Sequence, residues 1–214
     1  MQKENKPVIA VFDFDKTITA KHTFIRFFQR VSGPYQFYLV MMSLVPQMIR
    51  YKVGSIDLMT LREKAIQKFF HELSEDDYKK HCKQFVKDYI NHWLLEEAIN
   101  KINWHKSQNH KLVLLSNSPE DYLKIWADQF GFDFVLGSRF EFKNGMSTGK
   151  ISGDHCFGSE KVKRLKAVLG DTKNYYIYGY GDSKGDLDFL NMSDEAFYKH
   201  FNLKKNFTYE NSTI

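Results

Sequence analysis

The stretch that decides the fold is Val8-Ile9-Ala10-Val11-Phe12-Asp13-Phe14-Asp15-Lys16-Thr17. Five apolar, β-prone residues end abruptly in polar ones, which is typical of a parallel strand buried on both faces. Residues two apart on an extended chain point to the same side, so Asp13 and Asp15 can present both carboxylates to one ligand. Because neighbouring carboxylates repel each other, such a pair usually holds a cation or a proton between them. Taken alone, the pair fits a Mg²⁺ site and an ordinary polar loop equally well.

Strands and helices alternate along the rest of the chain. Apolar runs predict three more strands and one hairpin, at residues 111–115, 134–136, 175–178 and 140–145. Helical patterns cover residues from about 24 to 104, a helix that opens at 118–121, and residues 159–169. This alternation indicates a parallel sheet with helices on both faces.

The long helical block between the first two strands indicates an insert. A structureless connection of that length would be unusual, whereas a helical insert forms a natural cap. We therefore expect an α/β fold: a Rossmann-like parallel-sheet core with an all-helical cap inserted after the first strand. The expected boundaries are residues 1–18 and 93–214 for the core and residues 19–92 for the cap. Ligands in such sheets bind beyond the carboxyl ends of the strands, so a site is expected there.

The composition is that of a folded protein with a substantial core. Hydrophobic residues make up 43% and charged residues 27% of the 214 residues, which excludes a disordered, collagen-like or disulfide-dense chain. Two cysteines, Cys82 and Cys156, are too few for a disulfide framework, so we expect reduced thiols. A net charge of +5 and 16% aromatic residues would suit a nucleic-acid binder. The basic residues are scattered, however, and no binding motif occurs, so no nucleic-acid partner is predicted.

Two segments bear on the location of the protein. Residues 1–7 are polar and precede only a short apolar run, so we expect no signal peptide. The most apolar segment, residues 35–49, is shorter than the ~20 residues that cross a bilayer, and Pro46 interrupts it. We expect a cytoplasmic protein, with the membrane surface as the alternative location.

Polar side chains also lie near the ends of the other predicted elements. The second strand ends in Ser116-Asn117-Ser118 just before a helix, where a hydroxyl and free helical N–H groups can hold an anion. The fourth strand runs into a turn with Asp182 and Asp186, and Lys161 lies in the first turn of helix 159–169. Alone, each feature is ordinary: a helix cap, a polar turn, a solvated lysine. Together, at one edge of one sheet, they predict a site for a phosphate and a cation.

This set of residues resembles the haloacid-dehalogenase superfamily of aspartyl-phosphate phosphatases. The first motif is matched by Asp13-x-Asp15-x-Thr17, the second by Ser116, the third by Lys161, and the fourth by Asp182 with Asp186. The resemblance extends from Val8 to about Phe201. It is closest to the branch that includes phosphoserine phosphatase and phosphatidylglycerophosphatase of the C type, and the helical insert occupies the position of that branch's cap.

The resemblance implies a role for each residue of the first motif. Asp13 would attack phosphorus and form an aspartyl-phosphate, which splits one difficult displacement into two easier ones. Asp15 would protonate the leaving alcohol and then take a proton from the attacking water. Thr17 would orient the loop and not touch the substrate.

The resemblance also implies a metal and a phosphate-binding set. The ligands of Mg²⁺ would be Asp13, the backbone carbonyl of Asp15 and Asp182, and Asp186 would support the metal-bound waters. The groups that hold the phosphoryl oxygens would be Ser116, Asn117 and Lys161.

Two departures from the branch bear on the substrate. Phosphoserine phosphatases carry a Glu nine residues after the nucleophile, which grips the substrate ammonium, and here His22 stands at that position. They also place an Asn just before the second acid of the fourth motif, where this chain has Gly185. Both changes count against phosphoserine, and they make His22 a candidate on the substrate side.

The apolar start of the cap leaves two interpretations open. Residues 24–28 and 35–51 are rich in aromatic residues and methionine, with Arg26, Arg30, Arg50 and Lys52 nearby. They either form the cap's own core, which is the favoured interpretation, or face a membrane or lipid.

Such apolar content over a phosphate site suits a lipid phosphate. We therefore expect a Mg²⁺-dependent phosphomonoester phosphatase, with phosphatidylglycerophosphate as an example of its substrate and a peripheral membrane contact through the cap. Phosphoserine or another small metabolite is the alternative substrate. A non-catalytic membrane-surface binding protein on the same fold is the alternative of another class.

Overall fold

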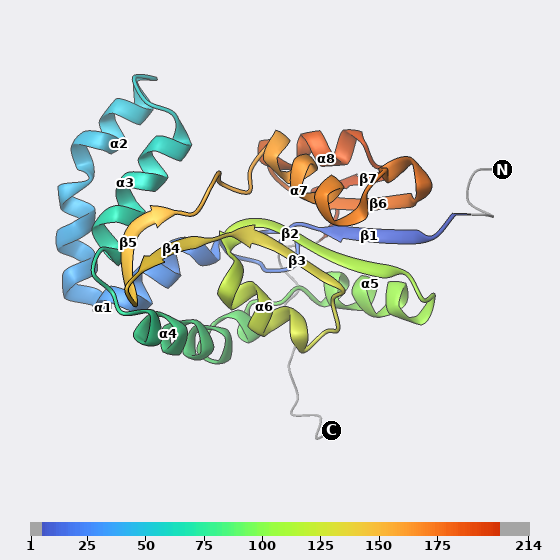
Figure 1. Ribbon diagram of the computed structural model, residues 1–214, viewed down its shortest axis with the longest axis horizontal. Helices are drawn as coiled ribbons and strands as arrows, with labels where there is room; N and C mark the ends of the chain where they lie inside the picture. Colours follow the sequence, from blue (N-terminus) through green and yellow to red (C-terminus); the bar gives the residue numbers. More distant parts are fainter. Residues whose placement is uncertain (1–5, 202–214) are drawn as a thin grey trace.

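The computed structural model describes residues 6–201, and a five-stranded parallel sheet lies at its centre (Figure 1). In spatial order the strands are β3 (Phe134–Ser138), β2 (Lys111–Pro119), β1 (Val8–Phe12), β6 (Tyr176–Gly181) and β7 (Glu195–Tyr198). All neighbouring strands run parallel. The predicted fold class, an α/β Rossmann-like core with a helical cap after the first strand, is confirmed.

The sheet separates two hydrophobic cores because side chains alternate along each strand. Ala10 and Phe12 of β1 face the core under α5 (Glu96–Ser107) and α6 (Glu120–Asp128), whereas Ile9 and Val11 face α7 (Ser159–Leu169) and α8 (Leu187–Asn191). Figure 1 shows these two helix pairs on opposite sides of the sheet. The first strand is therefore buried on both faces, as its continuous apolar run predicts.

The structure corrects two predicted elements. The helix expected to open at residues 118–121 begins at Glu120, because β2 continues as far as Pro119. Ser118 is thus a strand residue and not the cap of that helix. The strand β7 is absent from the prediction, since its four residues, Glu195–Tyr198, are too few to show an alternating pattern.

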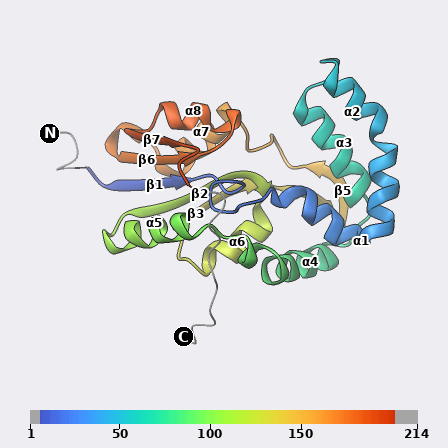
Figure 2. The same ribbon diagram turned by 180° about the vertical axis from the view of Figure 1, so that it is seen from behind.

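The cap is built from four helices, which lie beyond the carboxyl ends of the strands (Figures 1 and 2). They are α1 (Thr23–Ser43), α2 (Val45–Lys52), α3 (Leu58–Phe70) and α4 (Glu75–Asp88). Gly33 and Pro34 kink α1, and Asp57 caps α3 by accepting from the amide of Thr60. Ser74 caps α4 as predicted, through its hydroxyl and the amide of Asp77. Short 3₁₀ turns lie at Ile90–His92, Thr172–Asn174 and Lys184–Asp186.

A hairpin from the second half of the chain lies against the cap. The predicted Asn-Gly turn joins β4 (Phe140–Lys143) to β5 (Met146–Ile151), and both turn residues have a positive φ, 51° at Asn144 and 77° at Gly145. The amide of Ser147 donates to the carbonyl of Leu73 at 2.8 Å, and the amide of Glu72 donates back to Ser147 at 3.0 Å. The hairpin is therefore bonded to cap residues, while the expected domain boundaries after residues 18 and 92 stay a prediction.

Aromatic rings fill the interior of the cap and its contact with the core. Phe27 of α1 is fully buried, and its ring centroid lies 5.7 Å from Phe70, 5.2 Å from Phe85 and 5.1 Å from Tyr122. Because Tyr122 belongs to α6, one of the helices that cover the sheet, this packing joins the cap to the core domain. Many of the aromatic residues are thus structural, as the favoured interpretation of the cap expects.

Two further observations concern the cysteines and the membrane. Both cysteines, Cys82 and Cys156, are buried and unpaired, in agreement with the prediction of free thiols. Among residues 6–201, no helix combines the length and the apolar character needed to traverse a bilayer.

Candidate active site

The candidate site lies at the carboxyl ends of β1, β2 and β6, the end of the sheet nearest the cap (Figure 1). Phe12, the last residue of β1, pairs with Leu114 of β2 and with Tyr180 of β6. The amide of Asp13 continues this ladder, donating to the carbonyl of Tyr180 at 2.9 Å. The three strand ends are therefore in register, and the polar residues that follow them converge.

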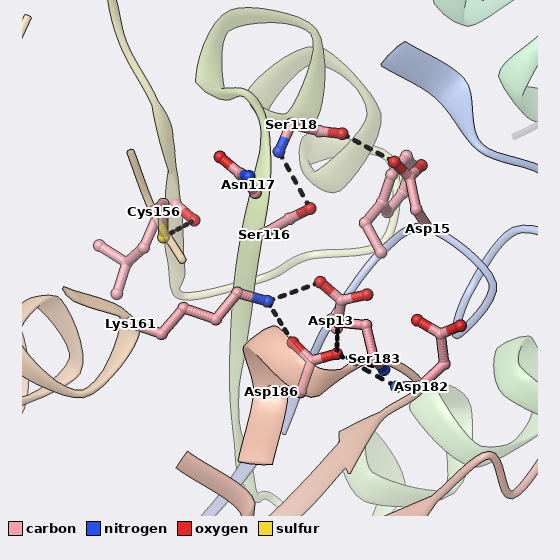
Figure 3. Close-up of polar contacts among 12 residues, drawn as sticks. Asp13, Asp15, Ser116, Asn117, Ser118, Cys156, Lys161, Asp182, Ser183 and Asp186 are labelled. Carbon is pink, nitrogen blue, oxygen red and sulfur yellow. Dashed lines mark hydrogen bonds and ion pairs between the residues drawn. The ribbon is translucent and has the colours of Figure 1, made fainter. Parts of the chain in front are cut away.

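A buried lysine joins two buried carboxylates at the centre of the site (Figure 3). Lys161 Nζ lies 2.7 Å from Asp13 Oδ1 and 2.5 Å from Asp186 Oδ1. The three residues are 2%, 5% and 0% exposed, respectively. Burying so many charges is costly unless each is paired, and this arrangement supplies the pairing. Lys161 comes from α7, so the helix after the hairpin completes a site begun by β1.

The pKa values in this cluster are strongly displaced. Burial, together with the charge of Asp186, raises the pKa of Asp13 well above its ordinary value, although Lys161 opposes the change. Burial alone would lower the pKa of Lys161, but Asp13 and Asp186 outweigh it, so the lysine stays charged. Carboxylates displaced in this way at the ends of strands are typical of functional sites.

Asp186 is held from both sides of its carboxylate. Its second oxygen, Oδ2, accepts from the hydroxyl and the amide of Ser183, at 2.7 and 2.9 Å, and from the amide of Asp182 at 3.2 Å. Burial raises the pKa of Asp186, but Lys161 and Ser183 together lower it by more, so the pKa of Asp186 lies below its ordinary value. Asp186 therefore stays ionised and orients the loop that carries Asp182.

The site contains a carboxylate cluster suited to a divalent cation. One oxygen each from Asp13, Asp182 and Asp186 lies within 4.8 Å of the others. Burial and the charge of Asp186 raise the pKa of Asp182 to about 6, and the nearby charges of His22 and Lys16 lower it. Concentrated, partly buried carboxylates with oxygen donors only are what Mg²⁺ prefers, so these residues fit the implied metal.

Asp15 faces away from this cluster and toward the cap. Its Oδ1 accepts from the amide of Thr23 at 3.0 Å and from the hydroxyl of Thr23 at 2.6 Å, and its Oδ2 accepts from Ser118 Oγ at 3.1 Å. Figure 3 shows its carboxylate directed toward Ser118, whereas Asp13 is directed toward Lys161. The two carboxylates, two residues apart in sequence, therefore occupy different hydrogen-bond networks.

The hydrogen-bond partners of Asp15 were not among the site residues predicted from the sequence. Thr23 carries no motif signal, and its role arises only because α1 begins beside the loop after β1. The hydroxyl of Ser118 was interpreted as a possible helix cap, and the extension of β2 to Pro119 instead brings it to Asp15.

The predicted phosphate-binding residues of β2 point in different directions. Ser116 is 2% exposed, and its hydroxyl accepts from the amide of Ser118 at 3.2 Å. Asn117 is turned away from Asp13 (Figure 3): its side-chain Oδ1 accepts from Ser138 Oγ at 2.8 Å. The structure thus brings Ser116 toward the carboxylates but not the side chain of Asn117.

The loop after β1 holds the remaining predicted residues. Lys16 has a left-handed backbone, with φ of 59°, which turns the chain sharply after Asp15. Thr17 is buried, and its hydroxyl has no hydrogen-bond partner within residues 6–201. His22 is exposed and forms the N-cap position of α1, close enough to Asp182 to influence its pKa.

A cap residue absent from the predicted set also reaches the site. Arg62 of α3 donates to the backbone carbonyl of Asn117 at 2.6 Å and stacks on the ring of Phe24 at 3.4 Å. Burial lowers its pKa to about 10, and the charges of Tyr122 and Asp15 oppose the change. No local motif marks this arginine, because it lies in the middle of an ordinary amphipathic helix.

Comparison with known proteins identifies the family. The profile of the haloacid dehalogenase-like hydrolases matches residues 10–191, which is most of the chain. The chain belongs to this family. The predicted resemblance is confirmed, and the predicted motif residues Asp13, Ser116, Lys161 and Asp182 all lie within the matched range.

Relatives of this haloacid dehalogenase-like hydrolase cover nearly its full length. Protein CicA of Caulobacter vibrioides is 27% identical over 198 residues, which are 92% of this chain and 88% of CicA. A Mycobacterium tuberculosis protein named a probable phosphatase is 24% identical over 193 residues, 87% of this chain and 67% of its own.

Solved structures share the fold of this haloacid dehalogenase-like hydrolase. A Bordetella pertussis protein of unknown function superposes with a TM-score of 0.74, at 21% identity over 87% of both chains. A substrate-bound phosphoserine phosphatase superposes with a TM-score of 0.62, at 17% identity over 91% of this chain and 87% of its own.

Proposed function

We propose that this hydrolase is a Mg²⁺-dependent phosphomonoester phosphatase that acts through an aspartyl-phosphate on Asp13. The observation that carries the proposal is the environment of Asp13. Lys161 holds one carboxylate oxygen at 2.7 Å, and the other oxygen, Oδ2, accepts no hydrogen bond from residues 6–201. A buried carboxylate with one oxygen fixed and one available is arranged as a nucleophile.

Asp15 suits the role of general acid and base. It is only half-buried, and three hydrogen bonds from Thr23 and Ser118 fix the orientation of its carboxylate. For protonation of the leaving alcohol, its carboxyl must turn from these partners toward the substrate oxygen. The same group then takes a proton from the water that hydrolyses the aspartyl-phosphate.

Two further groups would stabilise the phosphoryl oxygens. Lys161 supplies a buried positive charge beside Asp13, and in a site shielded from water such a charge is more effective than on the surface. Ser116 supplies a buried hydroxyl from the end of β2. The phosphate-binding role of Asn117 itself stays a prediction, since its side chain bonds Ser138.

The carboxylate cluster would hold the metal. Asp13, Asp182 and the backbone carbonyl of Asp15 would be the ligands, and Asp186 would support the bound waters. Mg²⁺ in such a site offsets the repulsion between the substrate phosphate and Asp13. Thr17 keeps the loop between these ligands in place from its buried position.

An apolar cavity in the cap favours a phosphate ester with an apolar portion as the substrate. An apolar cavity of about 200 Å³ lies between α1, α2 and α3, and Arg62, which also bonds Asn117, lines it. Its other walls are formed mainly by Phe24, Phe28, Met41, Leu44, Met48 and Leu61. A lipid phosphate such as phosphatidylglycerophosphate would use this cavity, and an enzyme acting on it would work in peripheral contact with a membrane.

Two observations disfavour phosphoserine as the substrate. His22 is a poor partner for the substrate ammonium because it carries no negative charge. A side chain at Gly185 would overlap the ring of Phe157, which fills the space that an Asn would need. Another small phosphate metabolite remains the second candidate, since the site itself recognises only the phosphate group.

The test compares the wild type with Asp13→Asn. We expect wild-type turnover of p-nitrophenyl phosphate to be lost on chelation and restored by Mg²⁺, and Asp13→Asn to lower kcat by at least about 10⁴-fold. Circular dichroism checks that the variant is folded. Undiminished turnover in Asp13→Asn would contradict the mechanism. A folded wild type without hydrolysis on any phosphate ester would favour the non-catalytic, membrane-surface alternative.

The substrate class needs a separate comparison. Phosphatidylglycerophosphate, phosphoserine and sugar phosphates are assayed side by side under the same Mg²⁺ conditions. We expect the highest kcat/KM with the lipid, because only the lipid can fill the apolar cavity. A clear preference for phosphoserine would overturn the interpretation of His22 and Gly185.

A further inference from the structure

The outer side of the cap carries a row of exposed apolar side chains, here called the outer stripe. It consists of Tyr35, Tyr38, Leu39, Met42, Val45 and Ile49, which are between 39% and 77% exposed. Spacings of three, four and seven residues place them on one side of a helix. Leu44, between α1 and α2, keeps right-handed helical backbone angles, so the stripe runs from the second half of α1 into α2.

The opposite side of the same segment is also apolar. Val40 and Leu44 are buried, and Phe37 and Met41 pack against the same core, with the ring of Phe37 5.5 Å from that of Phe69 on α3. A surface helix normally turns polar residues to the outside. This helical segment is apolar on both sides, and its packing against α3 accounts for only one of them.

The outer stripe has no partner within residues 6–201. Figures 1 and 2 both show α1 and α2 at the outer edge of the molecule, with α3 on their inner side. Contiguous exposed apolar surface of this kind marks a site of interaction with another surface.

The charges around the stripe indicate what that other surface is. From Lys16 to Ile56 the chain has no acidic residue, although the whole protein has 26. The basic residues in this range are Lys16, Lys21, Arg26, Arg30, Arg50 and Lys52. Arg50 and Lys52 at the end of α2 are exposed and form no ion pair within residues 6–201. Lys52 follows Ile49 by three residues, so it lies on the same side of the helix as the outer stripe.

We propose that the outer stripe docks the protein on an anionic lipid bilayer, with Arg50 and Lys52 against the headgroups. An exposed apolar row with tyrosines and flanking cations is the composition of helices that lie in the membrane interface. A second copy of the chain fits less well. Two outer stripes facing each other would bring together segments that carry only positive charge, without an acidic partner on either.

Docking through this segment has a consequence for the candidate site. The same helix, α1, begins at Thr23, which bonds Asp15 through both its amide and its hydroxyl. The apolar cavity lined by Phe24 and Leu61 lies between α1, α2 and α3, on the inner side of the stripe. The use of the bilayer as a source of lipid phosphate rests on the proposed function, whereas the docking itself does not.

The test is flotation with lipid vesicles. The full chain is mixed with vesicles of phosphatidylcholine alone or of phosphatidylcholine with phosphatidylglycerol, at low and at high salt. We expect binding to the anionic vesicles, with weaker binding in 0.5 M salt and on phosphatidylcholine alone.

Matched variants locate the contact. Tyr38→Ser/Ile49→Ser and Arg50→Glu/Lys52→Glu should each lower vesicle partitioning by about tenfold or more. The controls carry equivalent changes outside the cap, Val168→Ser/Tyr198→Ser and Lys166→Glu/Lys173→Glu, and should bind as the wild type does. Because none of these residues lies in the active site, hydrolysis of p-nitrophenyl phosphate should stay within about twofold in all four variants.

The outcomes separate docking from catalysis. Asp13→Asn should lose hydrolysis and keep vesicle binding. The docking proposal is overturned if the wild type fails to float with anionic vesicles, if the stripe variants float as well as their controls, or if light scattering shows that the stripe instead joins two copies of the chain. Loss of hydrolysis in the wild type would contradict the proposed function and leave the vesicle result unaffected.

Discussion

The edge of the sheet and the outer side of the cap depart from ordinary packing in opposite ways. At the edge, three charged side chains, Asp13, Lys161 and Asp186, are almost completely buried. On the cap, the six large apolar side chains of the outer stripe are exposed. Globular proteins generally do the reverse, since burial of a charge is costly and burial of an apolar side chain is favourable.

The difference between the two regions lies in how each departure is compensated. The buried charges compensate one another within the chain, through ion pairs of 2.7 and 2.5 Å. The exposed apolar stripe has no compensation within residues 6–201. One region is therefore complete by itself, and the other calls for a partner. Four substitutions can break or sharpen this contrast.

The largest effect is expected for Lys161→Met. Without the lysine, Asp13 and Asp186 remain buried beside each other with no cation between them, so the free energy of unfolding should fall by about 3 kcal/mol or more. Turnover should be lost as well. Urea denaturation and p-nitrophenyl phosphate assays measure the two effects. Lys163→Met, two residues along α7 and 73% exposed at its side chain, is the control and should change stability by less than about 0.5 kcal/mol.

The two sides of the cap should differ almost as strongly. Phe27→Ala empties a fully buried position surrounded by Phe70, Phe85 and Tyr122, and should lower the free energy of unfolding by about 3–5 kcal/mol. Ile49→Ala, on the outer stripe, should lower it by less than about 0.5 kcal/mol. Thermal or urea unfolding in the absence of vesicles decides the matter. A comparable loss in both variants would show that the stripe is part of the cap's core.

A smaller effect is expected at His155, which lies near Arg62 of the cap helix α3 and Arg164 of the core helix α7. His155 is 8% exposed, and burial together with the charges of Arg62 and Arg164 lowers its pKa to about 4. The unfolded chain, with an ordinary histidine pKa of about 6.5, binds the proton more readily, so stability falls as the pH drops from about 6.5 toward 4. Between pH 7 and pH 5 the contribution of His155 to the free energy of unfolding should decrease by about 2 kcal/mol.

The pH effect can be assigned by substitution. Urea unfolding at pH 7, 6 and 5 is compared for the wild type, His155→Phe and His71→Gln, the last at an exposed histidine of the cap. His155→Phe should remove most of the pH dependence, because neither ring nitrogen of His155 has a hydrogen-bond partner to lose within residues 6–201. An unchanged pH dependence in His155→Phe would refute the assignment.

The smallest effect should come from Thr23→Val. The change removes the hydroxyl bond of 2.6 Å to Asp15 but keeps the size of the side chain, so Asp15 should lose part of its orientation and kcat should fall by about tenfold. Thr23→Ser keeps the hydroxyl and should retain most of the activity. Equal kcat values for the two variants would mean that Thr23 serves only as the first residue of α1.

The sequence was informative wherever a signal was local. The switch from Val8–Phe12 to polar residues predicts β1 and the two carboxylates after it, because burial on both faces requires a continuous apolar run. Lys161 and Asp186 were predicted as site residues from their places in the first turn of a helix and after a strand, and the family resemblance implied their roles. Their bond to each other depends on residues far apart in the chain, and so the buried pairing could not be derived from either segment alone.

Local sequence patterns could not predict features that depend on how distant segments pack together. The contact of Ser118 with Asp15 depends on β2 extending past the point where a proline suggested the start of a helix. For residues 35–49 the sequence left cap packing and membrane contact as alternatives. The structure divides the segment between an inner side, with Val40 and Leu44, and an outer side, with Tyr35 and Ile49, a division that overall apolar content does not reveal.

The backbone bonds between the hairpin and the cap set a limit on modular engineering. Because Glu72 and Leu73 exchange hydrogen bonds with Ser147, the helices are tied to the sheet by a second segment of chain and not only by the ends of the insert. Excising residues 19–92 to obtain a minimal catalytic unit would leave β5 paired with β4 but without its backbone bonds to the cap, and the strand edge uncovered in this way would be prone to aggregation. Exchange of caps between relatives would have to move residues 140–151 together with the helices.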